Sequence, residues 1–209
     1  MMNKLITSLL LATIGCSYTS DKSLEIIERR EKSIIEVSDT LCIDIKSSEI
    51  NWKGTKMRGL GKHEGTIDLE SGYFLRINEK GIVGGEFVIN MKTIEVTDIP
   101  IDDPIPRRLL VDHLKDPDFF DVETFPYSVL EIKSIIDLNG RLKALGLLTI
   151  KGLQHPIDFE VVLIDDGYYA KIVLDRFKWN VAYEGSLLDR TLVDREIELV
   201  VNLKVAECN

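Results

Sequence analysis

The sequence predicts an all-β fold in which antiparallel strands close into a barrel. From residue 41 onward, apolar and polar residues alternate with a period of two, which is typical of strands with one buried and one solvated face. Short clusters of Gly, Asn and Asp separate these segments, as expected of hairpin turns. The chain has 209 residues, 44% hydrophobic and 29% charged, so it can bury one sizeable core and lacks the composition of a disordered chain.

Residues 1–15 are predicted to be an export signal of the lipoprotein type. One cation, Lys4, precedes an apolar run of about ten residues, which is shorter than the roughly twenty that a bilayer core requires. A glycine and Cys16 then resemble the end of a bacterial lipoprotein cleavage box, although Thr13 stands where Leu is usual. Cleavage there would leave Cys16 acylated and anchored in a membrane, in the periplasm or at the outer membrane. Ordinary signal-peptide cleavage nearby is the alternative.

Residues 16–40 are expected to form a solvated tether between this anchor and the barrel domain. The segment from residue 17 contains no Gly or Pro and is dense in charge. Apolar residues within it, among them Leu24, Ile27, Ile34 and Ile35, leave a short helix as the alternative. The barrel domain is predicted over residues 41–208.

Several segments of this domain alternate clearly enough to predict which side chains face inward. These side chains are Leu41, Ile43 and Ile45; Phe87, Ile89 and Met91; Ile157, Phe159, Val161 and Leu163; Ala170, Ile172 and Leu174; and Ile197, Leu199, Val201, Leu203 and Val205. Residues 59–77, 127–135 and 142–150 bring the total to about eight or nine strands. A closed barrel removes the exposed strand edges, and a two-sheet sandwich is the alternative.

A short helix and loop are predicted over residues 104–126. Three leucines between residues 109 and 114 stand at helical spacing, with Pro106 placed to begin the helix and Pro117 to end it. We expect this segment to cover one end of the barrel.

Cys42 and Cys208 occupy the start of the first strand and the end of the last. In an up-and-down barrel with an even number of strands, these two ends are antiparallel neighbours. A disulfide could then close the barrel in an exported protein, provided that the two Cα atoms come within about 7 Å. Two free thiols are the alternative, because Cys208 is the penultimate residue.

Seven short motifs follow one another in a fixed order through this domain. They are INWKGTK (50–56), GKHEG (61–65), GGEFVINM (84–91), HLKDPDFFDV (113–122), FP (125–126), GLLTIKG (146–152), and DRF with VAY (175–177 and 181–183). Together they resemble the YceI-like family of exported bacterial proteins. The resemblance implies an extended, lipocalin-like barrel of eight strands whose apolar channel binds a long lipid, such as a polyisoprenoid, with no catalytic centre. The chain departs from many relatives at residues 182–190, where a compact turn replaces a longer Gly- and Phe-rich loop.

Ligand-binding side chains are expected where the alternation and the resemblance place residues inside the barrel. They are Trp52, Phe87, Ile89, Met91, Leu114, Phe119, Phe120, Leu148, Ile150, Arg176 and Phe177. A lining of this kind suits hydrocarbon, although the same pattern also fits a barrel filled by its own side chains. For a polar head group at the channel mouth, the candidates are Arg107, Arg108, His113, Lys115 and Arg176. An internal ion pair with Asp175 or with another acidic neighbour is the alternative for Arg176.

No enzymatic activity, metal site or cofactor is expected. The three histidines, His63, His113 and His155, have none of the usual zinc-binding spacings, and turns account for the first and last. The chain has no nucleophile elbow or phosphate-binding glycine loop. A net charge of −9 with scattered basic residues argues against nucleic acid.

The expected partners are therefore a long-chain isoprenoid or other amphiphilic lipid, and the membrane through the N-terminal anchor. An envelope protein with a filled barrel, acting through its surface, is the alternative function. The oligomeric state stays open, with a dimer among the options.

Overall fold

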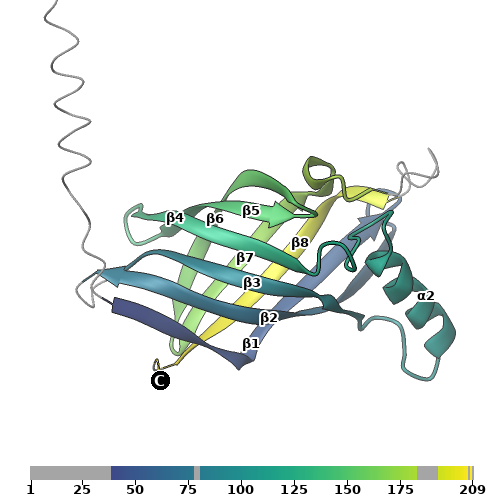
Figure 1. Ribbon diagram of the computed structural model, residues 1–209, viewed down its shortest axis with the longest axis horizontal. Coiled ribbons are helices and arrows are strands. Elements are labelled where there is room, and N and C mark those ends of the chain that lie inside the picture. Colours follow the sequence, from purple (N-terminus) through teal and green to yellow (C-terminus); the bar gives the residue numbers. More distant parts are fainter. Residues whose placement is uncertain (1–38, 78–80, 183–192, 207, 209) are drawn as a thin grey trace, which may run out of the picture. The chain divides into compact units, whose positions relative to one another are not determined.

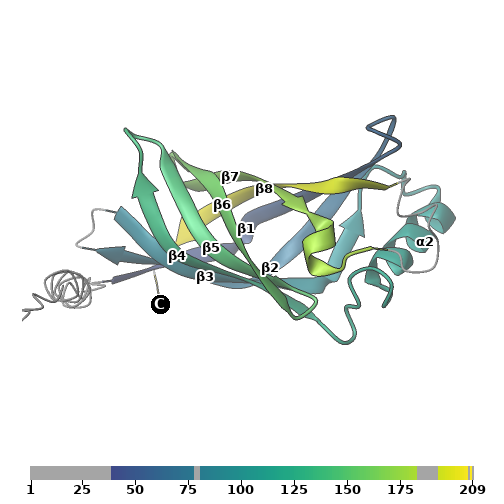
Figure 2. The same cartoon turned by 90° about the horizontal axis from the view of Figure 1, so that it is seen from above.

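Eight antiparallel strands close into a barrel (Figures 1 and 2). This computed structural model describes residues 39–77, 81–182, 193–206 and 208. The strands are β1 (Asp39–Lys56), β2 (Gly61–Ile77), β3 (Gly81–Val96), β4 (Tyr127–Asp137), β5 (Leu142–Ile150), β6 (Leu153–Ile164), β7 (Gly167–Asp175) and β8 (Val193–Ala206). Each strand pairs with the next, and β8 returns to pair with β1. The predicted eight-stranded antiparallel barrel is confirmed, and the sandwich alternative is wrong.

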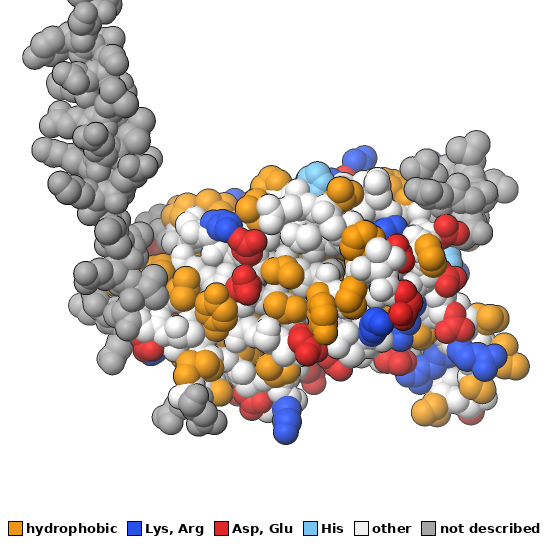
Figure 3. Space-filling model, viewed as in Figure 1, with side chains coloured by type: hydrophobic (Ala, Val, Ile, Leu, Met, Phe, Trp, Pro, Cys, Tyr) orange, Lys and Arg blue, Asp and Glu red, His pale blue; other side chains and the backbone are white. Residues whose placement is uncertain are grey.

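The predicted alternation is seen most clearly in β3 and β7. Phe87 and Met91 are buried on β3, and Ala170, Ile172 and Leu174 are buried on β7. Residues at the alternate positions, such as Lys171 and Val173 of β7, face outward. On the face shown in Figure 3, charged side chains of both signs mix with apolar ones. The core of the barrel is therefore formed by every second residue of its strands.

For three residues that the alternation places inward, the prediction is wrong, because their side chains are exposed. They are Ile45, Leu163 and Val205. Ile45 lies in a register irregularity of β1, where the carboxylate of Asp44 accepts hydrogen bonds from the backbone amides two and three residues further on. This irregularity interrupts the regular pleat, so the period of two is lost there. Leu163 and Val205 each lie one residue from the end of their strand, where the strand runs past the core.

Helix α2 (Pro104–Lys115) lies at the end of the barrel where β1 ends and β2 begins, which we call the α2 end (Figure 1). The helix begins at Pro104 and not at the predicted Pro106. Both prolines fit in a first turn, because the amides there have no acceptor within the helix. The predicted end before Pro117 is confirmed. No helix among the described residues is long and apolar enough to cross a membrane.

The opposite end of the barrel carries a disulfide between Cys42 and Cys208, with the two Cα atoms 5.2 Å apart. Cys42 is the register partner of Ala206, so the bond joins β1 to the chain just beyond β8. The structure therefore contains the predicted disulfide and not two free thiols. We call this the disulfide end.

Some of the predicted features lie outside the described residues. These are the signal peptide, the attachment residue Cys16, nearly all of the tether and nearly all of the 182–190 turn.

Candidate functional site

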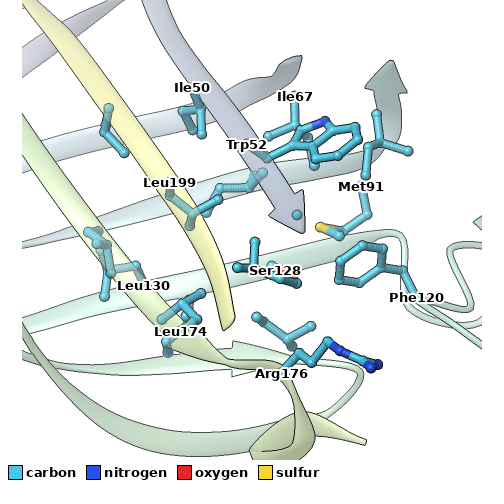
Figure 4. Close-up of a pocket in the computed structure, with 18 of the residues that line it drawn as sticks. Ile50, Trp52, Ile67, Met91, Phe120, Ser128, Leu130, Leu174, Arg176 and Leu199 are labelled. Carbon is cyan, nitrogen blue, oxygen red and sulfur yellow. The ribbon is translucent and has the colours of Figure 1, made fainter. Parts of the chain in front are cut away.

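A cavity of about 240 Å³ lies inside the barrel. All eight strands contribute to its lining, together with α2 and the loop that follows it. The lining is almost entirely apolar, and Figure 4 shows part of it, with Ile50, Ile67 and Leu199 around the interior. A filled core would leave no such space, so the structure contradicts the filled-barrel alternative.

The structure brings together at this cavity every predicted ligand-binding residue except Phe177. The lining includes Trp52, Phe87, Ile89, Met91, Leu114, Phe119, Phe120, Leu148, Ile150 and Arg176. The strand residues among them come from the inward rows of β1, β3 and β5, and the others come from α2, from the loop after α2 and from the chain after β7. Their contact with a ligand stays a prediction.

Phe177 does not line the cavity, and its predicted position is corrected. It belongs to the 3-10 helix η1 (Arg176–Trp179), which directly follows β7. The backbone amide of Phe177 donates to the carboxylate of Asp175 (3.2 Å), which caps this turn. Because a helical turn ends the strand alternation, the ring lies against two arginines instead, 4.4 Å from the guanidinium carbon of Arg176 and 5.8 Å from that of Arg195.

Arg176 is only 2% exposed and binds backbone carbonyl groups. These belong to Val181 (2.7 Å), Val193 (3.0 Å) and Asp194 (3.0 Å). The guanidinium group thus ties the chain after η1 to the start of β8. A buried charge needs such partners, because an unsolvated guanidinium group is very unfavourable.

Asp175, one of the acidic neighbours considered as an ion-pair partner of Arg176, pairs with a different arginine. Asp175 pairs with Arg195 at 2.6 Å, and this hydrogen bond lowers the pKa of the Asp175 carboxyl. Side chains of consecutive residues in a strand point to opposite faces. Adjacency in sequence therefore did not predict an ion pair between Asp175 and Arg176.

Polar side chains at the α2 end are mostly paired with one another. His63 Nδ1 lies 3.0 Å from the carboxylate of Asp98. The Thr55 hydroxyl donates to Asp194 at 2.6 Å, and this hydrogen bond is the main reason that the pKa of Asp194 is lowered. His63 belongs to β2 and not to the predicted turn, because the hairpin already turns at residues 57–60.

Of the predicted head-group candidates, His113 and Arg176 line the cavity, whereas Arg107, Arg108 and Lys115 do not. Arg107 pairs with Glu95 at 3.4 Å. His155, which was also predicted in a turn, lies in β6 with its ring 5.3 Å from that of Trp179.

Toward the disulfide end, the wall of the cavity is formed in part by aromatic rings. The ring of Phe74, only 2% exposed, lies 4.9 Å from that of Phe87 and 4.7 Å from that of Tyr168. Burial raises the pKa of Tyr168. At the rim beyond them, Arg76 pairs with Asp39. This end therefore offers a ligand mainly apolar surface.

Ser128 is a lining residue that the sequence analysis missed. It stands with Leu130 and Ile132 in the inward row of β4, all three in the cavity lining. A serine within an otherwise apolar row of period two was the available signal. The residue is only 4% exposed.

The family model of the YceI-like domain matches residues 42–205. The chain belongs to the YceI-like family. The predicted recognition is thereby confirmed over nearly all of the barrel. A search of the curated proteins finds no match.

Solved structures share the fold of this YceI-like barrel. BcnA of Burkholderia cenocepacia matches with a TM-score of 0.64 and 19% identity, over 79% of this chain and 99% of that one. A polyisoprenoid binding domain from Saccharophagus degradans, implicated in plant cell wall breakdown, matches with a TM-score of 0.54 and 11% identity, over 79% of this chain and 98% of that one. At these identities the likeness shows the fold alone.

Proposed function

We propose that this YceI-like protein binds one long-chain apolar lipid, such as a polyisoprenoid, non-covalently inside its barrel. The observation that carries the proposal is the apolar cavity of about 240 Å³ enclosed by all eight strands. Such a lining offers hydrocarbon a dry surface and few hydrogen bonds. The Saccharophagus degradans domain of the same fold, described as polyisoprenoid binding, supports this class of ligand.

The energetics suit a carrier or a store of lipid. Burying one five-carbon isoprenoid unit from water gains roughly 3 to 4 kcal/mol. A lipid that comes from a membrane leaves an equally apolar environment, so its net transfer is close to neutral. Loading and release are then both accessible. We further propose that this role lies in the bacterial cell envelope, a proposal supported by the export signal and the lipoprotein-type Cys16 that the sequence predicts.

Mass spectrometry of the full chain, purified gently from a bacterial host and extracted with organic solvent, tests the proposal. The unmodified protein is expected to release about one long-chain lipid per chain. Changing both Phe87 and Ile150 to Glu should abolish this lipid, because two charges would then face the apolar cavity.

The matched control changes Val88 and Thr149 to Glu, one residue along the same strands and outside the lining. This variant should keep the lipid. A folded wild-type protein that carries no lipid, and takes up none when incubated with prenyl alcohols or fatty acids, would contradict the proposal.

A further inference from the structure

Ser128 presents a buried hydroxyl group to the apolar cavity. Within the described part of the chain, its Oγ has no hydrogen-bond partner. Its register partner on β3 is Ile89, which also lines the cavity. Figure 4 shows Ser128 among the lining side chains, with Leu130 on one side and Phe120 on the other. Buried hydroxyl groups in native proteins nearly always have a partner, so this one requires an explanation.

Other polar groups in the lining at the α2 end have partners within the protein. Thr55 donates to Asp194, His63 lies beside Asp98, and Arg176 donates to backbone carbonyl groups. In the lining that the structure describes, Ser128 Oγ is the buried side-chain polar atom left without a partner. The missing partner must therefore come from what occupies the cavity.

We infer that Ser128 forms a hydrogen bond with a neutral oxygen of the bound lipid, such as a hydroxyl, carbonyl or ether oxygen. The inference rests on the proposed function and specifies its ligand class. A single hydroxyl between apolar neighbours cannot offset the burial of a charged phosphate or carboxylate, so the oxygen must be uncharged.

The position of Ser128 also orients the ligand. Ser128 is the second residue of β4, a strand that begins at the α2 end. The oxygen-bearing part of the lipid then lies inside the barrel near α2. Its hydrocarbon tail points toward the aromatic rings of Phe74 and Tyr168 at the disulfide end.

The test compares geranylgeraniol with the hydrocarbon that carries a methyl group in place of its CH₂OH. Dissociation constants for the full chain follow from the change in tryptophan emission, since Trp52 lies in the lining. Changing Ser128 to Ala should weaken binding of the alcohol by about 5- to 50-fold and leave the hydrocarbon within about twofold. Ser128→Thr, which keeps a hydroxyl group, should restore the preference for the alcohol relative to the Ala variant.

Ser134→Ala is the matched control, since Ser134 lies on the same strand but outside the lining, and it should change neither constant. Ligand-free Ser128→Ala should be at least as stable as wild type, because it removes an unpartnered polar group. If Ser128→Ala binds both ligands like wild type, a trapped water satisfies the hydroxyl and the inference is wrong, while the proposed function stands. If the wild type binds neither ligand, the proposed function fails and the inference falls with it.

Discussion

Gly65 lets strand β2 approach β3 beneath the indole ring of Trp52. A Cβ atom at Gly65 would lie 1.8 Å from the carbonyl oxygen of Glu95 and 2.8 Å from Cζ2 of Trp52. The indole Nε1 of Trp52 donates to that same carbonyl at 3.1 Å. The absence of a side chain at residue 65 therefore helps to hold Trp52 against the cavity.

Gly65→Ala should lower the free energy of unfolding by about 1 to 3 kcal/mol, because backbone atoms must move to admit the methyl group. Urea unfolding followed by circular dichroism measures this loss. The control is Gly54→Ala, where an added Cβ meets nothing within 4 Å. Equal unfolding midpoints for the two variants would contradict the close approach at Gly65.

Alternation in the sequence predicted part of the cavity lining residue by residue, because a strand residue's face depends on its place in the pleat. Phe87, Ile89 and Met91 illustrate this success. Phe177 failed because it lies in a helical turn, to which the period of two does not apply. The partners of Arg176 could not be predicted either, since they are backbone carbonyl groups brought together only by the fold.

The hairpin between β1 and β2 is tied to β8 by one carboxylate. Asp194 accepts hydrogen bonds from the Thr55 hydroxyl (2.6 Å) and from the backbone amides of Arg58 and Gly59 (both 2.9 Å). Arg58 and Gly59 have positive φ angles of 57° and 83°. Asp194 therefore satisfies amides in a turn whose backbone is otherwise unfavourable for Arg58.

These hydrogen bonds lower the pKa of Asp194 from its ordinary value of 3.8, and the bond from the Thr55 hydroxyl has the largest effect. A lowered pKa in the folded state stabilises the protein above the unfolded value, and this contribution is lost as the pH falls through the folded value. The amide proton shifts of Arg58 and Gly59 should therefore titrate together in NMR spectra, with a midpoint below 3.8.

Asp194→Asn should remove this titration, whereas the amide of Leu60, which donates to Met57 and not to Asp194, serves as the internal control. A midpoint at or above 3.8 would show that the carboxylate does not hold the turn in solution.

Boundaries and irregularities of the elements were harder to predict than the elements themselves. The sequence indicated a helix within residues 104–126 and predicted its start at Pro106, but Pro104 fits equally well in a first turn and the helix begins there. The irregularity after Asp44 depends on hydrogen bonds that include one from Lys204 to the Ser48 hydroxyl, and these residues are 156 positions apart. Local patterns do not reveal such distant partners.

At the scale of the whole molecule, the barrel is closed by pairing between β1 and β8 and by the Cys42–Cys208 disulfide. The two cysteines are 166 residues apart in sequence. A cross-link over so long a loop strongly restricts the unfolded chain, which in the chain-entropy model stabilises the native state by about 5 kcal/mol.

Replacing both Cys42 and Cys208 by Ser should lower the free energy of unfolding by about 2 to 5 kcal/mol, as measured by urea unfolding. Reduction of the wild type should produce a similar loss, and the same reductant should leave the double variant unchanged. A double variant that unfolds at the wild-type urea concentration would show that strand pairing alone determines the stability of the barrel.

The closed barrel could be predicted from the sequence, but the cavity could not be derived from alternation alone. Inward rows such as Ile197, Leu199 and Val201 fit a filled barrel and an open one equally well. The difference depends on how far the opposite walls stand apart. That distance is set by the tilt and register of all eight strands together.

Because β8 pairs with both β1 and β7, the binding site can form only after β8 has been synthesised and has joined the barrel. Ribosomes make β8 after the seven other strands of the barrel. Until it is in place, β1 and β7 present open edges that invite pairing with other chains, and the cavity lacks one of its walls. Any cargo can therefore be enclosed only after synthesis has reached the final strand, and a nascent chain must be kept from aggregating until then.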